Sequence, residues 1–115
     1  MEIINSRITK KELGEKSLHY FKTFIKVVVD IEKEIIALDA ELHSDLEAYL
    51  LESGSKQENL WGINLYPLND KENFIEFTSL INIRPHQDNY SMEITSSMVK
   101  EKIKGIVDKH IYYEA

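Results

Sequence analysis

The fold is decided by two runs of sequence, Glu58-Asn59-Leu60-Trp61-Gly62-Ile63-Asn64-Leu65-Tyr66-Pro67 and Phe74-Ile75-Glu76-Phe77-Thr78-Ser79-Leu80-Ile81-Asn82-Ile83-Arg84-Pro85. Both runs are rich in aromatic and β-branched residues, and each ends at a proline, which cannot donate to a strand ladder. The six residues between them, 68–73, are charged turn formers. We therefore predict a β-hairpin with extended segments over residues 60–66 and 74–84.

Strand alternation assigns the side chains of this hairpin to two faces, if the turn pairs Tyr66 with Phe74. The predicted core face carries Trp61, Ile63, Leu65, Ile75, Phe77, Ile81 and Ile83. The opposite face is predicted to be mostly wet or to bind a partner, and it carries Asn64, Tyr66, Glu76, Thr78, Asn82 and Arg84, with Leu60, Phe74 and Leu80 as its apolar members.

The same register brings the loop before the first strand and the loop after the second to one end of the hairpin. Asn82 then stands opposite Glu58, and Arg84 lies diagonal to Glu58, so we predict an ion pair between them. The polar loop 86–91 lies at this end and is where we first expect function. The predicted binding residues are Glu58, Asn82, Arg84, His86, Asp88 and Asn89.

Composition limits the function classes. The 115 residues predict one domain over residues 1–115, large enough to bury a single core without a metal or disulfide. Fourteen basic against twenty acidic residues give a net charge of −6, which disfavours nucleic acid and anionic membranes as partners. The chain has no cysteine, and its apolar runs are far shorter than the roughly 18 residues of a membrane span. We expect a cytoplasmic protein with no cofactor.

The segments before this hairpin predict a helix and two further strands. Residues 2–8 are either an edge strand or an arm packed on the core, and we favour the arm. Thr9-Lys10-Lys11-Glu12 matches a capping box, so a helix is predicted to begin at Lys10. Residues 24–42 alternate apolar and polar side chains, which predicts two antiparallel strands around Glu32-Lys33. A helix over residues 26–42 is the alternative, disfavoured by the β-branched residues.

Two more helices complete the predicted order. Ser44-Asp45-Leu46-Glu47 matches a second capping box, and the helix is predicted over Asp45–Ser53, with Gly54 after it. The last helix begins near Thr95 or Ser96, and its Gly105 suggests a close approach to the sheet. The fold class is α+β, with two layers, about four antiparallel strands and the order α-β-β-α-β-β-α. The first and last helices are expected on one sheet face.

Metal and nucleophile chemistry find little support. Glu41 and His43 stand at alternate positions with Asp45, which is a weak alternative for a divalent metal because only two ligands converge. His19 and His110 are interpreted as helix-surface residues, and no histidine pair has zinc-protease spacing. No Gly-x-Ser-x-Gly or Ser-x-x-Lys motif and no Gly-rich phosphate loop occurs.

The chain resembles a family of small, uncharacterised, single-domain bacterial and archaeal proteins. The residues that carry the resemblance are Glu41-Leu42-His43, the block Leu51-Glu52-Ser53-Gly54-Ser55-Lys56-Gln57-Glu58-Asn59-Leu60-Trp61-Gly62-Ile63-Asn64-Leu65-Tyr66-Pro67, and Ile81-Asn82-Ile83-Arg84-Pro85. It implies a prokaryotic, cytosolic, stand-alone domain and transfers no catalytic residue.

Two functions follow as hypotheses. The first is a non-catalytic ligand- or partner-binding or regulatory module, with an unknown protein or small molecule as partner and a possible homo-oligomer, in which Ile111-Tyr112-Tyr113 docks on a second copy or folds back on its own domain. In this reading Arg84 presents its fork to a carboxylate or phosphate, or simply pairs with Glu58. The alternative is a small hydrolase or metal-assisted enzyme, with His86 beside Asp88 as general base. Its residues would be Glu41, His43, Glu58, Arg84, His86 and Asp88.

Overall fold

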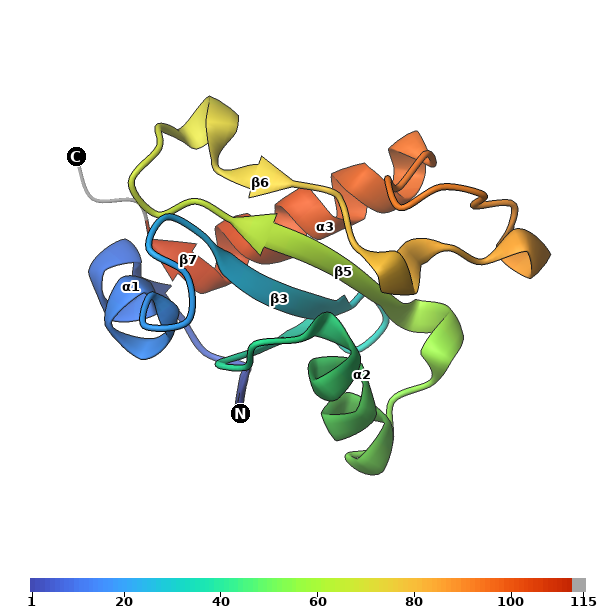
Figure 1. Cartoon of the computed structure of the whole chain (residues 1–115), viewed down its shortest axis with the longest axis horizontal. Helices are drawn as coiled ribbons and strands as arrows, with labels where there is room; N and C mark the ends of the chain where they lie inside the picture. Colours follow the sequence, from blue (N-terminus) through green and yellow to red (C-terminus); the bar gives the residue numbers. More distant parts are fainter. Residues whose placement is uncertain (113–115) are drawn as a thin grey trace.

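A five-stranded antiparallel sheet runs through the molecule, in the strand order β1-β4-β3-β5-β6. Figure 1 shows its strands β3, β5 and β6 side by side. The computed structural model describes residues 1–112, so Tyr113 of the predicted docking tail lies outside the described residues. The strands are Glu2–Ile4 (β1), Ile25–Asp30 (β3), Ile35–Leu38 (β4), Leu60–Leu65 (β5) and Ile75–Glu76 (β6). A short parallel pair, Ile8–Thr9 (β2) with Ile111–Tyr112 (β7), joins the two ends of the chain.

The helices lie on both faces of the sheet. Lys10–Ser17 (α1) and Ser97–His110 (α3) contribute Leu13, Ile103, Ile106 and Val107 to one core cluster, whereas His43–Glu52 (α2) contributes Leu46 and Leu50 to a second cluster on the other face. The α+β class and the shared face of the first and last helices are confirmed. The two-layer arrangement is wrong, because α2 forms a third layer.

Residues 24–42 form the predicted strand pair, β3 with β4. The turn closes without Asn-Gly because the buried carboxylate of Asp30 accepts hydrogen bonds from the backbone N–H groups of Glu32 and Lys33, both at 2.9 Å. Glu34 follows in the left-handed region at φ 56°. The N-terminal arm that we favoured is instead an edge strand, since β1 pairs with β4.

The capping predictions are correct for α1 and α3 and wrong for α2. Thr9 and Glu12 form the predicted capping box of α1, and the Ser96 side chain accepts from Val99 N at the start of α3. The box at Ser44 is wrong: Leu42 precedes α2 and makes no side-chain capping bond. Glu47, freed from that role, faces the interior.

The central hairpin has the predicted register over its first half. Tyr66 N donates to Phe74 O at 2.8 Å, and Asn64 stands opposite Glu76. The predicted strand to residue 84 is wrong, because the chain leaves the sheet after Glu76. Its continuation forms two short 3₁₀ helices, Leu80–Asn82 (η3) and Pro85–Gln87 (η4).

The predicted faces hold where the strand exists and fail beyond it. Trp61, Ile63 and Leu65 are buried in the α1 and α3 cluster, and Ile75 and Phe77 pack against it. Ile81 packs instead on the α2 cluster, and Ile83 is 44% exposed. The wet face is wrong for Asn64, Asn82 and Arg84, which α2 and the segment after Glu76 bury, whereas Glu76 is exposed as predicted.

Three smaller predictions concern the C-terminal part. An added Cβ at Gly105 would meet no atom within 4 Å, so the expected close approach to the sheet does not exist. His110 is buried rather than on the surface, and its Nδ1 donates to Ile106 O at 2.8 Å. Ile111 is buried on its own domain and pairs with Ile8, so the folded-back alternative describes this part of the tail.

Candidate functional site

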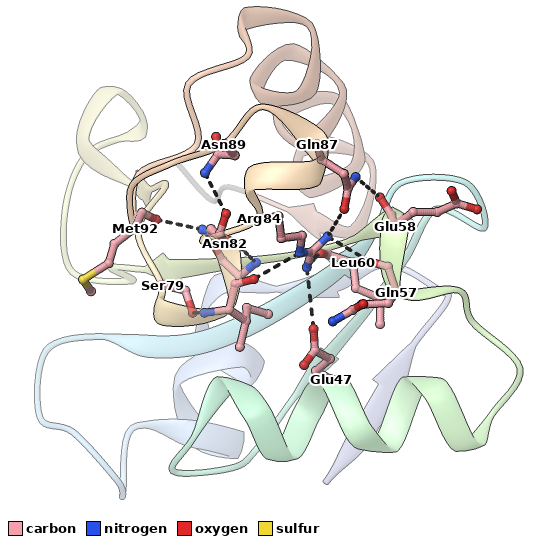
Figure 2. A network of polar contacts seen from close by, with 12 residues as sticks. Glu47, Gln57, Glu58, Leu60, Ser79, Asn82, Arg84, Gln87, Asn89 and Met92 are labelled. Carbon is pink, nitrogen blue, oxygen red and sulfur yellow. Dashed lines mark hydrogen bonds and ion pairs between the residues drawn. The ribbon is translucent and has the colours of Figure 1, made fainter.

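Arg84 lies at the centre of a buried polar network at the outer edge of β5 (Figure 2). Its guanidinium donates to three backbone carbonyls: Nε to Ile81 O at 3.1 Å, Nη1 to Gln57 O at 2.8 Å, and Nη2 to Leu60 O. The planar fork of arginine suits such divergent acceptors, which a point charge could not satisfy together.

The ion pair of Arg84 is formed with Glu47, not with Glu58, so the predicted pair is wrong. Nη2 of Arg84 lies 3.6 Å from Glu47 Oε2, and the guanidinium also lies 4.6 Å from the ring centre of Trp61. Burial lowers the pKa of Arg84, and the nearby charge of Glu47 opposes that shift. The predicted convergence of the two loops is nevertheless correct, since Gln87 Nε2 donates to Glu58 O at 3.0 Å.

The side chain of Asn82 takes the place of a neighbouring strand beside Gly62. Gly62 N donates to Asn82 Oδ1 at 2.8 Å, and Asn82 Nδ2 donates to Gly62 O at 2.9 Å and to Met92 O at 3.1 Å. One side-chain amide thus makes the pair of bonds that the backbone of an adjacent strand would make. The edge of β5 is satisfied here although β6 has ended.

Asn89 organises the loop that follows. Its Nδ2 donates to the carbonyls of Asn82, Ser91 and Glu93 at 2.7 to 3.0 Å, and its Oδ1 accepts from the N–H and hydroxyl of Thr95. Every polar atom of this side chain is used inside the chain. Asn82, Arg84 and Asn89 therefore position residues 77–96.

The structure does not gather the predicted binding residues at one surface point. Asn82, Arg84 and Asn89 are buried, while Glu58, His86 and Asp88 are exposed. The alternative enzyme set is also dispersed, because Glu41 is exposed and His43 is buried on another part of the sheet face.

A pocket of about 360 Å³ opens next to this network, between the N-terminus of α2 and residues 78–81. Lys26 and Asn64, which face each other across β3 and β5, belong to its lining. The apolar lining comes from Phe24, Leu42, Leu80, Ile81 and Met92. A concave, mainly apolar site with few polar groups is the usual form of a small-molecule pocket.

Asn64 is a polar member of the pocket lining. Its Nδ2 donates to Glu76 Oε1 at 2.8 Å and to Thr78 O at 3.3 Å, which fixes the orientation of the amide. Its Oδ1 is buried and meets no donor in hydrogen-bond geometry among residues 1–112, but it lies beside the His43 ring, because the Asn64 side chain raises the pKa of His43. Asn64 and His43 therefore form one polar pair in the wall of the pocket.

His43 is the second polar group of the pocket with a defined role. Its Nε2 lies 2.8 Å from Ile63 O, and because a carbonyl only accepts, Nε2 carries the proton and Nδ1 is an acceptor. Burial is the main cause that lowers the pKa of His43, and the charge of Lys26 lowers it further, whereas the hydrogen bonds with Ile63 O and with the Asn64 side chain oppose the shift. The ring is therefore neutral at pH 7.

The weak metal alternative gains no support from this geometry. Nε2 of His43 is occupied by Ile63, and Glu41 is exposed. Within the described part of the chain, no group of three or more His, Cys, Asp or Glu side chains is placed to hold a metal ion.

Sequence reasoning missed Lys26 and did not assign Asn64 to a site. A signal was present: both residues interrupt otherwise apolar strands, and both point to the same side of the sheet. Alternation gave that side for Asn64, but nothing in the pattern placed the N-terminus of α2 above it.

Fold and site define a small α+β protein, built on one five-stranded sheet and a short strand pair, with a ligand-sized pocket at the end of one helix. The chain belongs to the family described as "Protein of unknown function (DUF5674)", whose model matches residues 2–110. The resemblance to an uncharacterised family is thereby confirmed. No curated protein and no solved structure gives a significant match. No helix within residues 1–112 has the length and apolar character needed to cross a membrane.

Proposed function

We propose that this protein is a non-catalytic binding module that takes a small molecule in the pocket formed by His43 and Asn64. The observation that supports this most directly is the pocket of about 360 Å³, whose walls are mainly apolar and whose few polar members include Lys26, His43 and Asn64. A concave site with apolar walls and a few polar groups is the usual form of a small-molecule pocket.

The polar network next to the pocket supports the same proposal. Asn82 and Asn89 hold residues 77–96, and this segment supplies Ser79, Leu80 and Met92 to one wall. A wall fixed by buried hydrogen bonds is preorganised, so little ordering cost would oppose binding. The network thus fixes the shape of the pocket wall and is not itself the part that contacts the ligand.

The hydrolase alternative has no comparable support. The guanidinium of Arg84 already donates to three backbone carbonyls, and His86 and Asp88 lie on an exposed loop. A catalytic site needs its groups within hydrogen-bond reach of one reacting atom, and Arg84 is buried whereas His86 and Asp88 are exposed. A protein partner, a homodimer, the cytoplasmic location and a prokaryotic origin stay predictions.

The test is a fragment screen followed by ¹⁵N and methyl NMR. We expect hits to shift the side-chain amide of Asn64 and the methyl groups of Leu80 and Met92. Leu80→Ala should weaken those hits, whereas Leu68→Ala should not, because both leucines are highly exposed, at 71% and 75%, but only Leu80 lines this pocket. A screen whose hits all map away from Asn64, or that finds none, would contradict the proposal.

A further inference from the structure

We infer that the outer edge of β6 binds an extended segment of a partner protein as an additional strand, with a lysine or arginine of that segment among the glutamates of the edge. β6 is the last strand of the sheet, so one of its sides has no neighbouring strand (Figure 1). The inference does not depend on the proposed function, because β6 supplies no residue to the pocket that contains His43 and Asn64.

The backbone of Ile75 faces away from β5. Tyr66 N donates to Phe74 O, so these two residues form a hydrogen-bonded pair. In an antiparallel ladder the next pair, Leu65 with Ile75, then has its backbone groups directed outward. Within residues 1–112, the N–H and C=O of Ile75 make no hydrogen bond to a loop or a side chain. An incoming strand would pair with both groups, which is how extended peptides are recognised at sheet edges.

The chain itself pairs with this edge two residues further on. Ile94 N donates to Phe77 O at 3.0 Å, next to a short antiparallel bridge. The chain leaves the edge at the following residue, Thr95, whose N–H donates instead to Asn89 Oδ1 at 2.9 Å. The backbone beside Ile75 is therefore open directly next to a stretch that already has an extended partner, so this edge has the geometry that a further strand requires.

Two cavities flank the edge, and Ile75 and Phe77 belong to the walls of both. The cavity of about 640 Å³ lies against α3 and includes Lys104. The cavity of about 530 Å³ includes side chains of the opposite face of the strand pair, Tyr66 and Glu76. Because the side chains of an added strand alternate between the two faces of a sheet, successive residues of the partner would enter the two cavities in turn.

The charge of the second cavity selects the occupant. Glu72, Glu76 and Glu93 line it, and no lysine or arginine of residues 1–112 does. A basic side chain of an added strand would therefore meet opposite charge beside its backbone hydrogen bonds. Two copies of β6 side by side would instead bring the same glutamates together, and like charges across a strand pair are destabilising. The edge thus fits a basic segment of another protein and not a second copy of this chain.

The experiment titrates three capped peptides into ¹⁵N-labelled protein, with the backbone amides of Ile75 and Phe77 as reporters. The first is acetyl-Thr-Lys-Val-Lys-Thr-amide, whose valine would pair with Ile75 and whose lysines would face the glutamates. The second has Glu in place of both Lys, and the third has N-methylvaline at the centre. Titration to about 5 mM reaches dissociation constants of about 1 mM. We expect saturable shifts with the first peptide, binding about tenfold weaker or more with the second, and about fivefold weaker or more with the third.

Charge variants test the glutamates separately. Glu72→Gln with Glu93→Gln should weaken the lysine peptide about threefold or more. Glu15→Gln with Glu52→Gln removes the same net charge from two exposed glutamates outside this cavity and should leave the affinity unchanged.

Three results would each overturn the inference. The first is that the lysine peptide causes no saturable shift of the reporter amides. The second is that the N-methylated or the glutamate peptide binds as tightly as the lysine peptide, since binding would then not need the strand hydrogen bonds or the acidic cavity. The third is that the reporter amides shift with protein concentration alone, which would show that a second copy occupies the edge. None of these results affects the proposed function, whose reporters lie in the other pocket.

Discussion

Gly62 and Gly105 stand in opposite surroundings. A Cβ on Gly62 would lie 2.5 Å from the Cβ of Ser79, inside the segment that Asn82 holds against β5, whereas a Cβ on Gly105 would meet nothing within 4 Å. Gly62→Ala should therefore lower the free energy of unfolding by about 1–3 kcal/mol through overpacking. Gly105→Ala should raise it by about 1 kcal/mol, because alanine favours the exposed helix.

Urea denaturation of the two alanine variants beside the native protein measures both effects, and each variant is the control for the other. A destabilised Gly105→Ala would mean that the helix approaches another element at this point. A neutral Gly62→Ala would mean that the Ser79 segment moves easily, and the pocket wall would then not be preorganised.

Arg84 and Arg7 are the two arginines of the chain, and only Arg84 is buried. Arg84→Lys keeps the charge near Glu47 but cannot supply donors to the carbonyls of Ile81, Gln57 and Leu60 together. We expect a loss of about 3 kcal/mol or more in the free energy of unfolding, since buried carbonyls are left unpaired. Arg7→Lys is the matched control.

Both variants are compared by chemical denaturation at neutral pH. Equal stabilities would show that the fork geometry of Arg84 contributes nothing beyond its charge, which would contradict the role given to it here.

The roles of Asn82 and Arg84 could not be read from the sequence. Cross-strand geometry correctly brought residues 57–58 close to the segment after Arg84. It assigned Arg84 to a charged side chain, however, because bonds from a side chain to a backbone carbonyl leave no periodic trace in a sequence. An asparagine whose side chain takes the place of a strand also leaves no recognisable pattern in the sequence.

At the scale of elements, alternation and turn chemistry were sufficient for each pair of adjacent strands. The β-branched run before residue 31 distinguished β3 from a helix, and the turn 68–73 fixed the register of Tyr66 against Phe74. The end of β6 was not predictable in this way. Residues 77–83 keep a strand-like pattern, but Ser79 N donates to Met92 O, a distant partner, and the chain turns away.

His43, the first residue of α2, makes the stability of the protein depend on pH. The pKa of this ring is lowered in the folded protein, so both the folded and the unfolded state are neutral above about pH 6.5. As the pH falls below that value, the unfolded state binds a proton first, and stability falls until the pH reaches the lower folded pKa. Acidification should therefore lower the free energy of unfolding of the native protein, because His43 is protonated more readily in the unfolded state.

His43→Gln isolates this effect, because glutamine retains a donor for Ile63 O but does not titrate. The free energies of unfolding of native protein and variant are compared at about pH 7.5 and about pH 5. We expect the advantage of the native protein to shrink toward acid pH. An unchanged difference would show that His43 has the same pKa in both states.

At the scale of the whole molecule, the sheet separates two hydrophobic clusters. Val27 and Val29 of β3 face α1 and α3, whereas Val28 between them faces α2. The fold class could be predicted from the sequence because the apolar residues of each helix and strand recur at the spacing typical of that element. It did not predict the third layer, since α2 is short and the buried Asn64 and Asn82 disguised the face that it covers as a wet one.

Because the clusters lie on opposite faces, mutations in them should not share a cavity. Leu50→Ala in the α2 cluster should cost about 2–5 kcal/mol, and Ile103→Val in the α3 cluster about 0.5–1.5 kcal/mol. The double variant should equal their sum within about 0.5 kcal/mol, in one cooperative transition, since distant sites without shared partners add. Denaturation followed by both far-ultraviolet circular dichroism and Trp61 fluorescence measures this. A coupling above about 1 kcal/mol would show that strain passes through the sheet, and separate transitions for the two probes would show that the α2 layer unfolds on its own.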